Sequence, residues 1–347
     1  FGSSGCARSL GCPRGPAAFD IATPKPRRSG LPSAMAAGYP RSPVDHHDEA
    51  EVPDLPQGTI SRVGCVKNGD GLPNGNHIFL ALVTFGNRPP LRQHVCAVKQ
   101  MPRDGDYGRQ NWNEVFTLLE ARREGLAGVL HARAVFKDAA CLYVVLPWCR
   151  GGDLFTVVAS GAVALDESGL RSLTTQLLRL LAGLHDGGWA HGDICLENIV
   201  AAGDGTLKLI DFAQMRKVHD AHNPQNEVLM PWNVQTGREQ CFPPESMTPP
   251  AGALRSAKKG DVYQFGCLIH QLLTGSPPFE AHEVNVWPRS EVLETGGCRA
   301  TVEKLHGLGV PRLLGDFVGR LLAPDPARRP TAPEALAHPW VLGRVAR

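Results

Sequence analysis

The change of apolar periodicity at Gly151 and Gly152 constrains the fold of this chain more than any other sequence feature. Before this point, short apolar runs bounded by turn residues predict a set of strands interrupted by one helix. After it, leucines at i, i+3 and i+7 spacing predict a helix, and a second helix that is apolar on more than one face follows later. A strand-rich half followed by a helix-rich half predicts an α+β fold with two lobes and a ligand cleft between them. The expected strands are 78–83, 95–99, 134–136 and 142–146, and the expected helices are 112–123, 170–184 and 259–274.

The composition excludes several classes of protein. With 347 residues, of which 42% are hydrophobic, the chain can bury a sizeable core. A formal net charge of +2 gives no reason to expect nucleic acid as a partner, and no run reaches the roughly 18 apolar residues of a membrane-spanning helix. The ten cysteines form no C-x-x-C pair, which favours reduced thiols in a cytoplasmic protein. The basic run at 25–28 leaves a nuclear location open, and an upstream targeting signal also stays open because the first residue is Phe1.

The first 56 residues differ in composition from the rest of the chain. They are rich in Pro and Gly, and their apolar residues follow no period. Such a segment cannot bury enough surface to offset its ordering entropy, so we predict a disordered leader over 1–56. The remainder divides into an N-lobe at 57–146, a hinge at 147–150, a C-lobe at 151–342 and a short tail at 343–347.

Residues that could carry chemistry gather in the segment 191–198, His-Gly-Asp-Ile-Cys-Leu-Glu-Asn, and at Asp211. A Gly-Asp-Gly turn at 203–205 predicts a hairpin that brings Asp193, Asn198 and Asp211 together. Carboxylate and amide oxygens suit Mg²⁺, whose remaining ligands are often substrate phosphates, and a further carboxylate can accept a hydroxyl proton. Since Asn and Asp are also common in turns, simple turn chemistry is the alternative interpretation of this segment taken alone.

An upstream apolar strand contains Ala97 and Lys99. These two residues share one face, because side chains alternate across a strand. A small residue and a cation facing the cleft suit an adenine ring and its phosphates. A single strand lysine is more often a surface residue, so this interpretation depends on the other segments.

Taken together, these segments resemble the eukaryotic protein kinases, whose motifs V-A-I-K, H-R-D-x-x-x-x-N, D-F-G and A-P-E occur in this order. The resemblance covers about residues 57–342 and implies a bilobal kinase fold. In that fold a small β-rich N-lobe holds one helix and a larger C-lobe is helical. The matching segments are 97–99, 191–198, 211–213, 243–245, 261–266 and 325–340.

The resemblance assigns roles residue by residue. It implies that Lys99 binds the phosphates of ATP and pairs with a helix glutamate, for which Glu114 is our choice and Glu120 the runner-up. Asp193 would be the catalytic base, acting with Lys99 and Asn198. Asn198 and Asp211 would hold Mg²⁺.

Further nucleotide contacts are implied in the glycine-rich loop, the hinge and the floor of the cleft. Glu245 and Arg329 would form a buried ion pair that anchors the activation segment. The partner would be a protein substrate. The additional nucleotide-binding residues are Gly69, Gly71, Gly75, Ala97, Leu146 as gatekeeper, Trp148, Asp153 at the ribose and Val200 under the adenine.

The chain departs from the family at four places. The glycine-rich loop at 69–75 has one residue too many, and Ala213 replaces the D-F-G glycine. Gly192 replaces the arginine that reads a loop phosphate, which predicts activation without loop phosphorylation. Cys195 replaces the lysine two residues after the base, and the threonine expected before P-P-E is missing as well. We hypothesise that Arg238 supplies the cation that Cys195 does not.

We therefore expect transfer of the γ-phosphate of Mg-ATP to a protein hydroxyl. Serine or threonine is favoured over tyrosine because the catalytic loop lacks the tyrosine-kinase pattern, and Glu197 could attract a basic substrate residue. Thr236 is the only Ser, Thr or Tyr between Ala213 and Glu245, so it is the only candidate for a phosphosite there. Two alternatives stay open: a non-catalytic pseudokinase module, because of the departures, and a small-molecule phosphotransferase, because of the His-Gly-Asp sequence.

Overall fold

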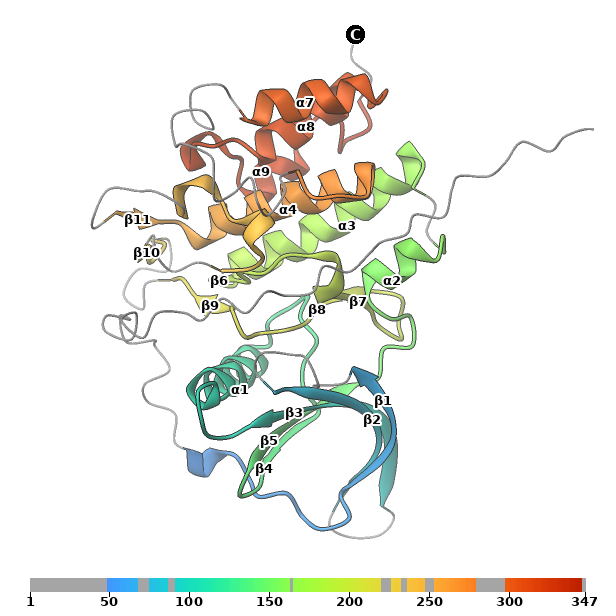
Figure 1. The fold of residues 1–347 in the computed structure, drawn as a ribbon, viewed down its shortest axis with the longest axis vertical. Coiled ribbons are helices and arrows are strands. Elements are labelled where there is room, and N and C mark those ends of the chain that lie inside the picture. The colour runs from blue at the N-terminus through green and yellow to red at the C-terminus, as the bar shows by residue number, and fades with distance from the viewer. Residues whose placement is uncertain are drawn as a thin grey trace, which may run out of the picture. The chain divides into compact units, whose positions relative to one another are not determined.

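The computed structural model describes residues 49–67, 75–86, 91–162, 165–219, 226–231, 236–246, 253–278 and 297–344. Figure 1 shows their helices and strands. The predicted leader up to residue 48, the glycines Gly69 and Gly71, and the tail from residue 345 lie outside these ranges.

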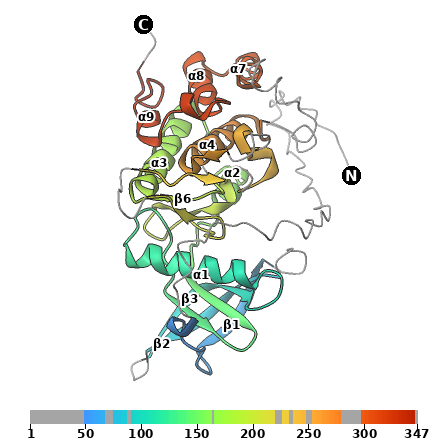
Figure 2. The same cartoon turned by 90° about the vertical axis from the view of Figure 1, so that its left-hand side faces the viewer.

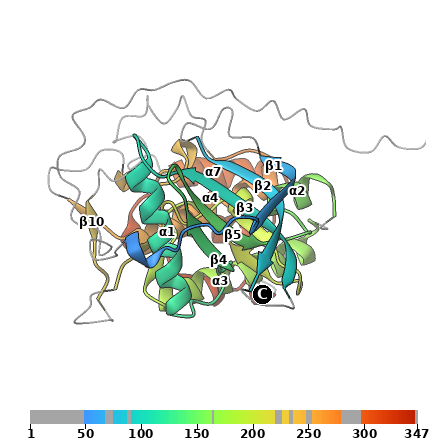
Figure 3. The same ribbon diagram turned by 90° about the horizontal axis from the view of Figure 1, so that it is seen from below.

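Five antiparallel strands form a sheet in the N-terminal half, in the order β1-β2-β3-β5-β4. Each of the four predicted strands lies within one of them, and the additional strand β1 precedes the irregular glycine loop. Figure 3 shows this sheet from below. The strands are β1 (Ile60–Lys67), β2 (His77–Phe85), β3 (Arg92–Pro102), β4 (Ala134–Lys137) and β5 (Cys141–Pro147).

The two faces of this sheet have different partners. On one face Phe79, Val98 and Val145 belong to a small apolar core of their own. On the other face, Lys99 reaches groups of α1 and of the helical half. Since side chains alternate along β3, Ala97 lies on the same face as Lys99. The pattern of the sequence therefore fixes which face of the sheet borders the site.

Helix α1 (Gly108–Arg123) follows β3 and begins four residues before the predicted start at 112. In Figure 2 it lies across the sheet, on the side of the helical region. Its buried residues Val115 and Leu118 join the main core together with Met101 and Leu142 of the sheet. This core extends through both halves of the described chain, so the helix is packed from both sides.

The second half of the chain is mainly helical. The leucine stripe of α3 (Glu167–Asp186) is buried, and α4 (Ala257–Thr274) is buried on nearly every side, as its apolar residues on more than one face predicted. The predicted α+β class is confirmed. None of the helices that the structure describes is long and apolar enough to cross a membrane. The other helices are α2 (Leu154–Ala159), α7 (Gly297–Gly307), α8 (Arg312–Leu321) and α9 (Ala332–Leu336).

Short elements connect these helices and carry the polar residues of interest. The hairpin predicted around 203–205 is present as the antiparallel pair of β7 and β8. The short strands are β6 (Trp189–Ala190), β7 (Ile199–Ala201), β8 (Leu207–Leu209), β9 (Arg216–Lys217), β10 (Met230–Pro231) and β11 (Leu254–Arg255). The 3-10 turns are η2 (Glu49–Glu51), η3 (Leu196–Asn198), η4 (Glu239–Cys241), η5 (Pro244–Ser246) and η6 (Pro326–Arg328).

Residues 49–56, which the sequence analysis assigned to the leader, contact the sheet. Val52 is 1% exposed and belongs to the main core. Asp54 pairs with Lys137 at the edge of β4, and the Leu55 amide donates to the Lys137 carbonyl at 2.7 Å. The packed region therefore begins at or before Glu49. A single buried valine shows no periodicity, and backbone pairing at a sheet edge leaves no residue pattern, so the sequence could not show this boundary.

Replacing Val52 tests whether this segment is part of the folded unit. We expect Val52→Ala to lower the free energy of unfolding by about 1–3 kcal/mol, because a buried valine loses methyl contacts. The matched control is Val63→Ala, since Val63 is 61% exposed on β1. That control should stay within about 0.5 kcal/mol of the wild type. Denaturant titration measures both, and equal effects would mean that the segment does not stabilise the fold.

Candidate active site

Lys99 on β3 lies between two carboxylates. Its Nζ is 2.5 Å from Glu114 Oε1 on α1 and 3.5 Å from Asp211 Oδ1 after β8. Glu120, the runner-up, points elsewhere and pairs with Lys217 of β9 at 3.1 Å. Burial disfavours the charged form of Lys99, but Glu114 and Asp211 outweigh it and raise the pKa of the ammonium. The structure thus holds a charged lysine where three elements meet.

The β7–β8 hairpin brings the remaining polar residues to the same place. The Asn198 Nδ2 donates to the Asp193 backbone oxygen at 3.0 Å and to its Oδ2 at 2.9 Å. The Ile210 amide donates to the Asn198 carbonyl at 2.9 Å, which fixes Asp211 beside the loop. Asp211 has a φ of 67°, a left-handed conformation in which non-glycine residues are uncommon. The three residues that the hairpin was predicted to assemble are therefore neighbours.

The two aspartates of this group have different electrostatic surroundings. Burial raises the pKa of Asp193, while the charges of His191 and Arg238 act in the opposite direction. For Asp211, burial is outweighed by Lys99 and by the Ala213 amide, which lower its pKa. One carboxylate is thus the better proton acceptor, and the other stays ionised, as a cation ligand requires.

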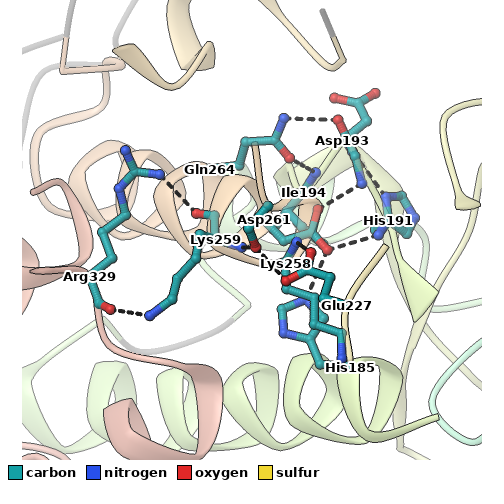
Figure 4. Close-up of polar contacts among 12 residues, drawn as sticks. His185, His191, Asp193, Ile194, Glu227, Lys258, Lys259, Asp261, Gln264 and Arg329 are labelled. Atoms are coloured by element: carbon teal, nitrogen blue, oxygen red, sulfur yellow. Dashed lines mark hydrogen bonds and ion pairs between the residues drawn. The ribbon is translucent and has the colours of Figure 1, made fainter. Parts of the chain in front are cut away.

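Buried side chains of α4 hold the loop that carries Asp193, as Figure 4 shows. Asp261 accepts hydrogen bonds from the backbone amides of His191 at 2.8 Å and Gly192 at 2.7 Å. The Ile194 amide donates to Gln264 Oε1 at 3.0 Å. The loop is therefore fixed by side chains of a helix about 70 residues later in the chain.

The structure explains why position 192 is occupied by glycine. Its φ is 80°, and an added Cβ would lie 2.9 Å from the Gln214 carbonyl oxygen and 3.3 Å from the Thr236 Cβ. A larger residue would need both the left-handed conformation and a shift of the neighbouring segment. An arginine at this position would therefore require a different path of the chain.

Apolar residues lie beside these polar groups. Ala97 faces Leu80 of β2 on one side and Leu146 of β5 on the other. Val200 packs with Leu130 and Cys149 in one cluster, and Leu146 borders it. Leu80 was missed in the sequence analysis, because the irregular glycine loop hides the register of β2. Its position opposite Ala97 is visible only from strand pairing.

Three of the other predicted nucleotide contacts lie in the described part of the chain. Trp148 follows β5 and is half-buried, and Gly75 precedes β2 with a φ of 64°. Asp153 accepts a hydrogen bond from the Thr156 amide at 2.7 Å and thereby caps α2. Asp153 also forms a bridge with Val200. Gly69 and Gly71 lie outside the described residues.

Oxygen donors for a magnesium ion are present next to Lys99. Asn198 gives both amide hydrogens to Asp193, which leaves its amide oxygen as an acceptor, and Asp211 supplies an ionised carboxylate. Within the described ranges, no three His, Cys, Asp or Glu side chains are grouped to hold a metal by themselves. Two oxygen ligands fit an ion that completes its shell with substrate phosphates.

The ion pair of Glu245 and Arg329 that the resemblance implied is present. Arg329 Nη1 donates to Glu245 Oε1 at 2.7 Å and Nη2 to Oε2 at 2.5 Å. Arg329 is fully buried, and its remaining N–H groups donate to backbone carbonyls at Lys259, Ala323 and Pro324. The segment before α4 is therefore fixed to the loop around η6.

Comparison with known proteins identifies the family. Residues 89–341 match the family model of the protein kinase domain, so the chain belongs to that family. It is 27% identical over 214 residues to the serine/threonine-protein kinase PKH2 of Candida albicans, covering 61% of this chain and 21% of that protein.

Two further relatives are also named as kinases. The calcium and calcium/calmodulin-dependent serine/threonine-protein kinase of Lilium longiflorum is 29% identical over 223 residues, covering 63% of this chain and 39% of that protein. CDPK-related kinase 8 of Arabidopsis thaliana is 26% identical over 340 residues, covering 91% of this chain and 51% of that protein. The chain spans less than two thirds of the length of each of these relatives.

Proposed function

We propose that this chain is a protein kinase that transfers the γ-phosphate of Mg-ATP to a serine or threonine hydroxyl of a protein substrate. The assembly of one site from separate segments carries the proposal. It joins the Lys99–Glu114 pair to Asp211 and to the hydrogen-bonded pair of Asp193 and Asn198. Membership of the protein kinase family supports the reaction type, and the names of the relatives support the choice of serine or threonine.

In the proposed reaction, the acceptor hydroxyl oxygen bonds to the γ-phosphorus as the bond from this phosphorus to the β–γ bridging oxygen breaks. The hydroxyl proton moves to the Asp193 carboxylate, and the bridging electron pair leaves with ADP. Asn198 orients the Asp193 carboxylate, and Lys99 binds the α- and β-phosphates. Asp211 and Asn198 would hold Mg²⁺, which neutralises charge on the phosphates when it is bound.

The adenine would lie between the sheet and the floor of the cleft. Ala97 and Leu80 would cover one face of the base, and Val200 the other. Leu146 closes the inner end as gatekeeper, and the hinge residue Trp148 follows it. Asp153 would reach the ribose, and Gly75 would end the loop over the phosphates.

The test is transfer of labelled γ-phosphate by the full chain onto a generic basic protein, with Asp193→Asn as the blank. Acid hydrolysis of the product then identifies the labelled residue. Phosphoserine or phosphothreonine that is absent from the blank supports the proposal, whereas phosphotyrosine overturns the specificity. Label on choline, ethanolamine or a sugar instead of protein would favour a small-molecule phosphotransferase.

A non-catalytic binding module is the second candidate, and Cys195 is the observation that favours it. A thiol carries no positive charge, and burial raises the pKa of Cys195, so this position of the catalytic loop is neutral. Absence of transfer, combined with a melting temperature that Mg-ATP still raises, would establish this second function.

We expect phosphorylation of the activation segment to have no role in turning the enzyme on. Thr236 is buried, and its hydroxyl accepts a hydrogen bond from Arg255 Nη2 at 3.5 Å. Gly192 offers no side chain to bind a phosphate. Phosphatase treatment should therefore leave the transfer rate unchanged. A rate that falls after treatment and returns after autophosphorylation would contradict this expectation.

A further inference from the structure

The catalytic loop itself supplies no cation to the transferring phosphate. Cys195 stands two residues after Asp193, is buried, and is uncharged because burial raises the pKa of its thiol. During transfer, a negatively charged phosphoryl group would approach Asp193 and Asp211. Without a further positive charge, this arrangement places like charges together in a site where solvent screens them poorly.

Arg238 brings a positive charge to this place from the activation segment. Its Nη1 is 2.7 Å from Glu197 Oε1, on the 3-10 turn that follows Cys195. The Arg238 side chain is 43% exposed, so part of it is accessible to an incoming phosphate. One nitrogen contacts Glu197, and a guanidinium has five N–H donors, so donors remain for a phosphate.

The backbone before Arg238 runs directly against the catalytic loop. Gly237 has a φ of 87°, and an added Cβ would lie 3.3 Å from Asp193 Oδ1 and 3.0 Å from the Gly192 carbonyl oxygen. Only glycine combines this conformation with so close an approach. Arg238 is therefore attached at a fixed point next to Asp193.

Gln264 of α4 clamps these two segments together. Its Nε2 donates to the Gly192 carbonyl at 2.8 Å and to the Thr236 carbonyl at 3.0 Å, while its Oε1 accepts from the Ile194 amide. All these contacts are buried, and one side chain satisfies three backbone groups of two segments. The turn that presents Arg238 is thus tied to the loop that presents Asp193 without any phosphate.

We propose that Arg238 takes the place of the missing catalytic-loop lysine and binds the transferring γ-phosphate in the transition state. This inference rests on the proposed kinase activity. Glu197 has a positioning role, because its carboxylate accepts a hydrogen bond from Arg238 Nη1. We therefore no longer expect Glu197 to attract a basic substrate residue, because its carboxylate already pairs with an arginine of this chain.

The experiment compares kcat and the dissociation constant of Mg-ATP for the full wild-type chain, Arg238→Ala and Arg238→Lys. The control is Arg179→Ala, an exposed arginine on α3. We expect Arg238→Ala to lower kcat by about 10²-fold, the loss seen when one preorganised donor to a transition state is removed. Nucleotide binding should stay the same, because Lys99 and Asp211 are untouched. Arg238→Lys should retain more activity than Arg238→Ala, and Arg179→Ala should retain all of it.

A further readout separates a phosphate-binding role from a merely structural one. Adding Cys195→Lys to Arg238→Ala should restore part of kcat, because it returns a cation to the loop.

The outcomes are distinct. A wild-type chain that transfers phosphate, with an Arg238→Ala variant of equal kcat, overturns this inference and leaves the proposed function standing. A wild-type chain without transfer overturns both. If the double variant fails to fold, as its melting curve would show, the loss of kcat at constant nucleotide affinity and its partial retention in Arg238→Lys decide the question alone.

Discussion

Replacing Asp193 by asparagine is expected to lower the rate of phosphate transfer by about 10²–10⁴-fold, the contribution of a positioned general base. The substitution keeps the size of the side chain, and Asn198 Nδ2 can still donate to an amide oxygen in place of Asp193 Oδ2. The site should therefore keep its geometry and lose only the ability to take up a proton. Initial rates of transfer measure the effect directly.

Nucleotide binding by the same variant shows whether the site stays intact. Since Lys99, Asp211 and Asn198 are unchanged, Mg-ATP should raise the melting temperature of Asp193→Asn as much as that of the wild type. Asp204→Asn is the matched control, because Asp204 is exposed in the β7–β8 turn and its carboxylate accepts hydrogen bonds from the amide and the hydroxyl of Thr206. Full activity of Asp193→Asn would exclude this residue as the base.

Local patterns were sufficient to predict the elements that carry the site. Alternation placed Ala97 and Lys99 on one face of a strand, and helical spacing predicted the helix that carries Glu114. The turn at 203–205 predicted the hairpin that joins Asn198 to Asp211. Each of these inferences uses residues close together in the chain, where spacing alone determines geometry.

Contacts between distant segments could not be predicted in this way. Gln264 sits in a motif whose apolar pattern predicts only a buried helix, yet it hydrogen-bonds two backbone segments from elsewhere. Arg238 was hypothesised to supply a cation, but its pairing with Glu197, 41 residues earlier, depends on the path of the activation segment. The position of Leu80 opposite Ala97 depends on strand register, which the irregular glycine loop hides. The packing of Val52 depends on a sheet edge that has no sequence pattern.

Contacts between distant segments also explain why a departure from the family is compatible with an intact site. Gly192 and Gly237 lie against each other, and the space that an arginine at 192 would occupy is filled by the segment around Thr236. Gln264 connects these two segments by buried hydrogen bonds. The Gly192 substitution, which looks like a loss in the sequence, is thus part of one packed arrangement with Gly237 and Gln264.

The largest effect on stability is expected from Arg329. All five N–H groups of this fully buried side chain are used, two on Glu245 and three on backbone carbonyls, and its guanidinium lies 4.9 Å from the centre of the Tyr263 ring. Arg329→Ala leaves the Glu245 carboxylate without its partner and removes hydrogen bonds to three backbone carbonyls. We expect it to lower the free energy of unfolding by about 3–5 kcal/mol, the usual effect of removing one partner of a buried pair.

Arg328→Ala is the matched control, because Arg328 is the adjacent arginine of the same turn and is exposed. Its removal should change the free energy of unfolding by no more than about 0.5 kcal/mol. Urea titrations of the two variants and the wild type compare the effects under one condition. Glu245→Gln should also be destabilising, because it leaves the buried guanidinium charge unpaired. Equal stability of Arg329→Ala and Arg328→Ala would show that the pair does not anchor the segment before α4, and the activation segment would then need another attachment to the helical region.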